Sequence, residues 1–212
     1  MKKNILNLFT LVALLIAIVG FKNNTEETAI TGTKATLESN LNDVKYTANI
    51  EESTIEWKGF KPTGSHSGTI NIKSGEFTSK DGTVNSGDFV IDMNSIKERK
   101  GSARLEGHLK SADFFDVEKF PIAGFEITGL EEKEDITMLS GNLTLKGIKN
   151  NVSFPVTVTQ EGDTITISSD VFTIDRSKWN VKYGSKSFFK NLKDKFINDD
   201  IELKITVKAS KS

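Results

Sequence analysis

Apolar and polar residues alternate along most of the chain after residue 45. From Val152 to Val158 every second residue is apolar, and from Ile201 to Val207 the same period of two returns. A period of two is typical of a strand with one buried face and one solvated face. The pattern predicts eight strands and a ninth near the C-terminus, at 53–60, 65–74, 75–81, 86–93, 122–131, 134–146, 150–160, 163–176 and 200–209.

Turn-forming residues separate these segments and set the fold class. Connections this short join neighbouring strands antiparallel. We therefore predict an all-β domain, an extended antiparallel eight-stranded barrel, with a sandwich as the other architecture that fits. The interior of an eight-stranded barrel is either filled by side chains or holds one small ligand. Pro155 marks an edge, a bulge or a bend in its strand. The predicted turns are Lys73-Ser74-Gly75, Asp81-Gly82, Ser86-Gly87, Lys146-Gly147 and Glu161-Gly162-Asp163.

Two segments interrupt the alternation. Within 95–121 we expect a short helix near 101–112 followed by an aromatic loop. Within 185–200 the apolar residues Phe188, Phe189, Leu192 and Phe196 recur at roughly helical spacing, which predicts a short helix that caps one end of the barrel.

The N-terminus has the pattern of an export signal. Lys2 and Lys3 precede an unbroken apolar run, Leu11 to Val19, and mostly polar residues follow Gly20. We predict a signal peptide at 1–20, a flexible linker at 21–44 and a barrel domain at 45–212, in a periplasmic or secreted protein. The alternative is an uncleaved membrane anchor; otherwise the mature form has no membrane span. The chain has no Cys, so disulfides and lipoprotein acylation are excluded.

Composition narrows the function classes. The net charge is −1, and it becomes −3 when residues 1–20, with two lysines and no acidic residue, are removed. Mild acidity argues against nucleic acid as a partner and against a polybasic membrane-surface protein. Phe is abundant, with 14 residues against two Trp and two Tyr. Phe has no polar group, so it suits either a filled core or an apolar tunnel, and composition alone leaves both open.

The segment Arg104–Pro121 combines Phe114, Phe115 and Phe120 with charged residues in an otherwise strand-rich sequence. It resembles the characteristic segment of the YceI-like family, periplasmic lipocalin-like barrels that bind polyisoprenoid lipids. Further motifs occur in the family's order, and together they cover the chain from about Tyr46 to Ala209. They are Gly64-Ser65-His66-Ser67-Gly68, Phe89-Val90-Ile91-Asp92-Met93, Gly141-Asn142-Leu143-Thr144-Leu145-Lys146-Gly147 and Phe172-Thr173-Ile174-Asp175-Arg176.

The resemblance implies an exported binding protein that holds one small amphiphilic lipid, with an isoprenoid or acyl tail, in an apolar tunnel. No other cofactor is expected. Polar contacts to the head group are expected from His66, His108 and Arg176. The alternative is a purely structural role: each His bonds backbone carbonyls, and Arg176 pairs with Asp92, Asp175 or a carboxylate of the insertion. Expected tail contacts are Trp57, Phe60, Phe89, Ile91, Leu105, Leu109, Phe114, Phe115, Phe125, Phe154, Phe172, Trp179 and Tyr183.

Catalysis and metal binding are not expected. The chain has no nucleophile elbow and no phosphate-binding glycine loop, and two separated His residues do not form a zinc site. Two other classes stay open: an interaction protein with a filled core, and an enzyme whose titratable groups converge at the pocket. Exposed strand edges leave a homodimer open as well.

Overall fold

A computed structural model describes residues 43–212, so the predicted signal peptide and all but the last two residues of the predicted linker lie outside the described residues. Strand β1 begins at Val44, one residue before the predicted start of the barrel domain. Ten strands form one antiparallel sheet. They are β1 (Val44–Ala48), β2 (Thr54–Lys61), β3 (Gly64–Lys80), β4 (Thr83–Glu98), β5 (Ile122–Lys133), β6 (Ile136–Leu145), β7 (Ile148–Glu161), β8 (Thr164–Ser169), β9 (Phe172–Asp175) and β10 (Asp200–Lys211), with helices α2 (Ala103–Lys110), η1 (Arg176–Trp179) and η2 (Lys193–Lys195).

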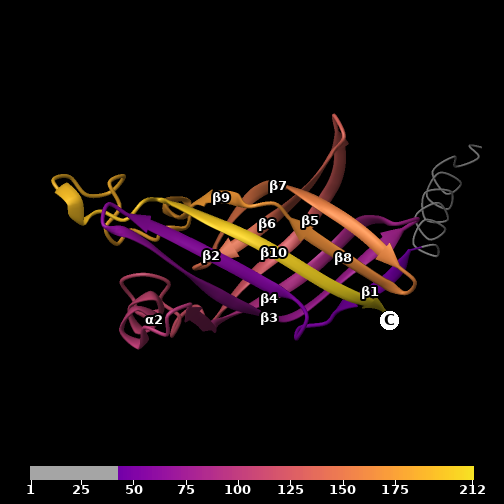
Figure 1. Ribbon diagram of the computed structural model, residues 1–212, viewed down its shortest axis with the longest axis horizontal. Helices are drawn as coiled ribbons and strands as arrows, with labels where there is room; N and C mark the ends of the chain where they lie inside the picture. Colours follow the sequence, from indigo (N-terminus) through magenta and orange to yellow (C-terminus); the bar gives the residue numbers. More distant parts are fainter. Residues whose placement is uncertain (1–42) are drawn as a thin grey trace, which may run out of the picture. The chain divides into compact units, whose positions relative to one another are not determined.

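The sheet closes into an eight-strand ring, which confirms the predicted barrel. Ten strands fit eight positions because two positions are each shared by two short strands. β1 and β2 both lie between β10 and β3, at opposite ends of the barrel, and β8 and β9 pair in succession along β10. Figure 1 shows β10 running the length of the barrel between β2 on one side and β8 and β9 on the other.

The predicted turn at Lys73-Ser74-Gly75 is wrong. Residues 64–80 form the single strand β3, and its pairing with β4 shifts register between Ile72 and Ser74. A bulge inserts one extra residue and so switches the buried face from even to odd positions. Ile72 is buried before the bulge and Phe77 after it. The break in alternation is therefore a bulge within a strand, which the sequence pattern cannot distinguish from a turn.

Two further strand predictions need correction. The predicted turn at Ser86-Gly87 lies inside β4, where Gly87 allows the close approach of Phe77. The predicted strand 163–176 is divided into β8, β9 and the start of η1. Pro155 lies where that division occurs: its carbonyl accepts from the N–H of Asp170, just beyond the end of β8. Because β8 ends there, the missing N–H of Pro155 costs no ladder hydrogen bond.

The helical predictions have two outcomes. The helix expected near 101–112 is α2, Ala103–Lys110, and the aromatic loop follows it. The helix expected within 185–200 is wrong, because this segment forms turns and the three-residue η2. Left-handed backbone at Asn191 and Lys193 breaks any helical continuation between Phe189 and Phe196.

The end of the barrel that carries the β3–β4 and β7–β8 turns is densely packed. Ile165, Ala209 and Val84 are buried there, and the rings of Tyr46 and Phe77 stack at 5.3 Å between centroids. Strand β1 covers this end by pairing with both β3 and β10. Space for a ligand is therefore confined to the opposite end. Within residues 43–212, no helix has the length and apolar character needed to cross a membrane.

Candidate binding cavity

A cavity of about 540 Å³ is lined by residues of α2, of the β2–β3 turn and of the segment 183–198. These parts of the chain lie together at one end of the barrel (Figure 1). Its walls are apolar residues at every second position of the surrounding strands, as Ile201 and Leu203 of β10 illustrate. Exposed Lys61, Asp194 and Lys195 belong to the same lining, so the cavity opens to solvent at this end. Its volume falls within the range of about 300–1000 Å³ that is usual for small-molecule sites.

The aromatic insertion closes one side of the cavity. The Phe114 and Phe115 rings are buried and meet edge to face at 5.1 Å, and both line the cavity. The loop is tied to the barrel by Lys146, whose Nζ donates to the Phe114 carbonyl at 2.7 Å. Burial lowers the pKa of Lys146, against the opposing effect of the nearby Asp116 carboxylate. The Lys146-Gly147 turn of the family motif therefore fixes the aromatic loop in place.

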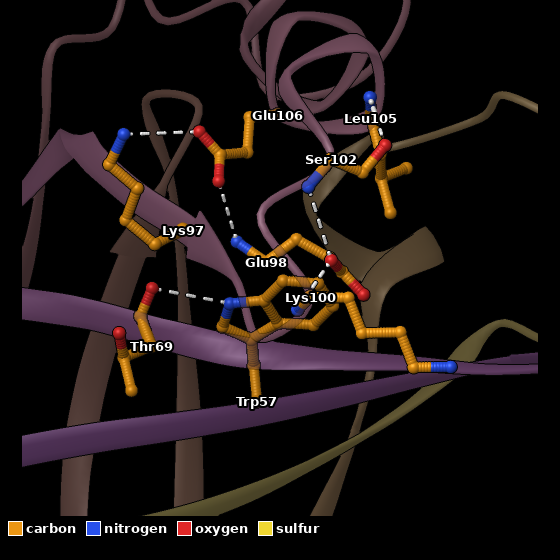
Figure 2. A network of polar contacts seen from close by, with 8 residues as sticks. All are labelled: Trp57, Thr69, Lys97, Glu98, Lys100, Ser102, Leu105 and Glu106. Carbon is orange, nitrogen blue, oxygen red and sulfur yellow. Dashed lines mark hydrogen bonds and ion pairs between the residues drawn. The ribbon is translucent and has the colours of Figure 1, made fainter.

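The carboxylates of Glu98 and Glu106 position the start of helix α2 (Figure 2). Glu106 accepts from the Glu98 N–H at 3.0 Å and from Lys97 Nζ at 3.1 Å. Ser102 caps the helix by accepting from the Leu105 N–H. These contacts direct Leu105, His108 and Leu109 toward the cavity, which all three line.

His66 lies at the mouth of the cavity beside a buried acid. Its Nδ1 is 3.4 Å from Glu98 Oε1, and the Glu98 side chain is only 3% exposed. Burial acts to raise the pKa of Glu98, but hydrogen bonds from the Ser102 and Lys100 N–H groups and from His66 outweigh it, so the pKa lies below its usual value. An ionised Glu98 orients the His66 ring and leaves Nε2 free of this contact.

His108 contributes a second imidazole at the mouth. Its ring packs edge-on against Tyr183 at 4.5 Å between centroids, and both side chains line the cavity. Its Nε2 lies 3.9 Å from a carboxylate oxygen of Asp113. The two imidazoles come from β3 and α2, so a polar head group at the mouth would meet donors from two different elements.

Arg176 lines the cavity, but its guanidinium is fully buried and already bonded. Nε donates to the Asn198 carbonyl at 3.0 Å, Nη1 to Val181 at 2.6 Å and Nη2 to Ile197 at 3.1 Å. Nη2 also lies 3.3 Å from a carboxylate oxygen of Asp199. The ion-pair partner is thus Asp199, and not Asp92, Asp175 or a carboxylate of the insertion, as considered from the sequence. Burial lowers the pKa of Arg176, while Asp199 and Asp175 raise it.

Packed phenyl rings, here called the floor, lie beyond the inner end of the cavity and are not part of its lining. A separate space of only about 60 Å³ lies among these rings, with Ile55 and Ile91 in the walls of both spaces. Phe89, Phe125 and Phe154 line this smaller space, and Phe154 stacks on Phe172 at 4.1 Å. Two glycines make room for the rings: a Cβ at Gly75 would lie 2.2 Å from the Phe89 ring, and one at Gly141 would lie 2.2 Å from the Phe125 ring.

The predicted ligand contacts therefore fall into three groups. Phe89, Phe125, Phe154 and Phe172 belong to the floor. Trp179 lines neither space, because its ring is fully buried and its Nε1 donates to the Leu143 carbonyl. The remaining predicted residues line the large cavity: Trp57, Phe60, His66, Ile91, Leu105, His108, Leu109, Phe114, Phe115, Arg176 and Tyr183.

Sequence reasoning missed other lining residues. Strand parity marks some of them, since Ile55, Leu143, Leu145, Ile201 and Leu203 each occupy the inward face of an alternating strand. Lys61 and Lys195 carry no such signal, because only the folded chain brings these exposed lysines, at the ends of β2 and η2, to the mouth. Among residues 43–212, no group of three or more His, Asp or Glu side chains is arranged to hold a metal ion.

Residues 46–209 match the YceI-like domain. The chain belongs to the YceI-like family. Protein YceI of Salmonella arizonae is 30% identical over 96 residues, which are 45% of this chain and 50% of the relative. The chain thus matches about half the length of such curated relatives.

Solved structures share the YceI-like fold. Burkholderia cenocepacia BcnA has a TM-score of 0.60 at 22% identity, covering 77% of this chain and 99% of that structure. A polyisoprenoid-binding domain from Saccharophagus degradans, implicated in plant cell wall breakdown, has a TM-score of 0.59 at 13% identity, covering 80% of this chain and 99% of its own. At these identities the likeness establishes the fold.

Proposed function

We propose that this protein binds one amphiphilic lipid, with an isoprenoid or acyl tail in the cavity and a polar head at the mouth. The observation that carries the proposal is the apolar cavity of about 540 Å³, open at one end and enclosed by the aromatic insertion. A core filled by its own side chains, the alternative for this fold, would leave no such space. The polyisoprenoid-binding relative from Saccharophagus degradans supports the same ligand class.

Tail burial supplies the affinity. A prenyl or acyl tail would bury several hundred Å² of apolar surface, on the order of 10 kcal/mol gross at roughly 25 cal/mol per Å². Loss of ligand freedom consumes a large share of that energy, which leaves affinities of about micromolar or tighter. Apolar contacts are non-directional, so tails of the same length but different chemistry should bind similarly. The phenyl floor, in contrast, limits how deeply a tail can enter.

Head-group contacts are assigned to His66 and His108, together with Lys61 and Lys195 of the lining. These side chains offer several donors, whereas Asp194 is the one acidic residue of the lining. An anionic or hydrogen-bond-accepting head is therefore favoured. Arg176 is left out of this set because its donors hold backbone carbonyls and Asp199.

Export completes the proposal. The signal-like residues 1–20 support a location in the periplasm or outside the cell, where a carrier would shield a water-insoluble tail. Cell fractionation with N-terminal sequencing tests this part. Recovery of the chain in the cytoplasm with Met1 intact would contradict it.

Lipid binding is tested by native mass spectrometry of the protein as the cell produces it, followed by lipid extraction and identification. A bound species with a prenyl or acyl tail is expected. Ala123→Phe would place a ring in the cavity and should remove the bound lipid, whereas Ile136→Asp changes an exposed residue outside the cavity and should not. A lipid-free mass, with no uptake of added prenyl lipids or fatty acids, would overturn the proposal.

A further inference from the structure

A strongly basic and aromatic loop borders the mouth of the cavity. Residues 182–196, here called the basic aromatic loop, contain five lysines and one aspartate, and all five lysines are exposed. Phe188 and Phe189 are 43% and 49% exposed. The loop carries a formal charge of +4 in a chain whose total is −1. The rest of the chain therefore has a net charge of −5 (−1 minus +4), whereas this segment beside the opening is net basic.

The base of this loop is held rigidly against the barrel. Arg176 bonds the carbonyls of Val181 and Ile197, on either side of the loop, and the Ile197 N–H donates to Gly184 at 2.8 Å. The Asn198 N–H donates to the Phe60 carbonyl of β2 at 2.9 Å. The buried Arg176 thus fixes both ends of the loop, and the exposed phenyl rings project from a set position next to the mouth.

Two of the five lysines in the loop have an aromatic neighbour. Lys182 Nζ lies 5.0 Å from the centre of the Phe188 ring, and Lys186 Nζ lies 3.4 Å from the centre of the Phe196 ring. Phe196 in turn lines the cavity. A phenyl ring flanked by an ammonium group matches the boundary of a bilayer, where the ring meets acyl chains and the ammonium meets phosphate.

We propose that the basic aromatic loop docks the mouth of the cavity on an anionic phospholipid bilayer. Phe188 and Phe189 enter the acyl boundary while Lys186, Lys190 and Lys193 contact lipid phosphates. Lysines near an anionic membrane each contribute a substantial and salt-sensitive attraction. An acidic protein surface would satisfy the lysines but would leave two phenyl rings without an apolar contact, which favours the bilayer. Docking here lets a tail pass from membrane to cavity without crossing water.

Vesicle co-sedimentation of the full exported chain tests docking without any measurement of lipid uptake, so its failure is separable from failure of the proposed cavity function. We expect binding to vesicles of phosphatidylcholine mixed with phosphatidylglycerol, and much weaker binding to phosphatidylcholine alone. Lys186→Glu/Lys190→Glu/Lys193→Glu should weaken binding to the anionic vesicles about tenfold or more. Phe188→Ser/Phe189→Ser should weaken it at both low and high salt.

The matched control reverses three lysines at the other end of the barrel: Lys80→Glu/Lys133→Glu/Lys211→Glu. Strand β3 runs from Gly64 beside the mouth to Lys80 at the far end, so these charges lie away from the loop. The control should lose less than the loop variant despite an equal change in charge. Equal losses in the two triple variants, wild-type binding by the loop variants, or no preference of the wild type for anionic vesicles would each overturn docking. Binding of an acidic protein in place of vesicles would overturn it too.

Discussion

Replacing Arg176 by Met should separate the two roles considered for this residue. The guanidinium is fully buried, and it holds three backbone carbonyls together with the Asp199 carboxylate. Met retains an apolar stem of similar length but supplies no donor. If Arg176 is a structural clamp, the substitution leaves the mostly buried Asp199 carboxylate without its positive partner and three carbonyls without their donor, and it destabilises the fold.

The size of the effect follows from those contacts. Removing one partner of a buried ion pair costs about 3–5 kcal/mol, because the remaining charge stays desolvated. Three unsatisfied carbonyls add to this, although residues 181–198 lie near solvent and can relax toward water. We expect a loss of about 4 kcal/mol in the free energy of unfolding. With a urea slope of about 2 kcal/mol per M, the midpoint should fall by roughly 2 M.

Equilibrium urea unfolding followed by tryptophan fluorescence measures this midpoint, since Trp179 is fully buried in the same 3₁₀ helix. Lys178→Met is the matched control, because Lys178 is exposed one residue from Trp179. An unchanged midpoint in Arg176→Met, combined with lost preference for anionic head groups, would refute the clamp and restore Arg176 as a ligand contact.

Three further predictions test the floor, the glycine contacts and the acid response. Phe154→Ala removes a ring stacked on Phe172 at 4.1 Å, so it should lower the free energy of unfolding by about 3–5 kcal/mol. It should also admit longer lipid tails, which mass spectrometry of the bound lipids would show. An unchanged limit on tail length would contradict the role of the floor. Gly141→Ala would place a Cβ 2.2 Å from the Phe125 ring and 2.7 Å from the Glu126 carbonyl. Urea unfolding should therefore show a loss of about 1–3 kcal/mol in the free energy of unfolding. The control Gly129→Ala should change little, because no atom lies within 4 Å of a Cβ there. Burial raises the pKa of Asp199, but hydrogen bonds from Ser185 and Ser187 and the charge of Arg176 lower it further, so its net pKa is depressed. The ionised Asp199 should therefore stabilise the fold fully above about pH 4, and this stabilisation should be lost at lower pH. Asp199→Asn should make the urea midpoint less dependent on pH in acid. An equally steep pH dependence in that variant would contradict the assignment to Asp199.

Alternation revealed the barrel because a closed sheet with one dry face imposes period two on nearly every strand. The same rule placed Trp57 and Ile91 on the inner face, and both line the cavity. Periodicity failed at β3, where the bulge between Ile72 and Ser74 has the sequence pattern of a turn. It failed again at 185–200, where spacing near 3.6 arises from turns and not from a helix.

The division between cavity and floor could not be predicted, because both consist of inward-facing apolar residues. The floor rings pack over glycines of neighbouring strands, Phe89 over Gly75 and Phe125 over Gly141, and such cross-strand contacts cannot be read from the pattern of one strand. The role of Arg176 was equally hidden. Its partners are backbone carbonyls of Val181, Ile197 and Asn198, and backbone groups leave no trace in the residue types.

Strand β10 pairs with β1, β2, β8 and β9, so it forms the seam between the first and last strands of the ring. Its 12 residues, Asp200–Lys211, follow all the other strands of the ring in the chain. Contacts between residues so distant in sequence form late, because the intervening chain must first be ordered. A growing chain therefore cannot complete this barrel before β10 is synthesised. Until then the chain stays open, which is the state that the export proposed above would require for thread-like passage through a secretion pore.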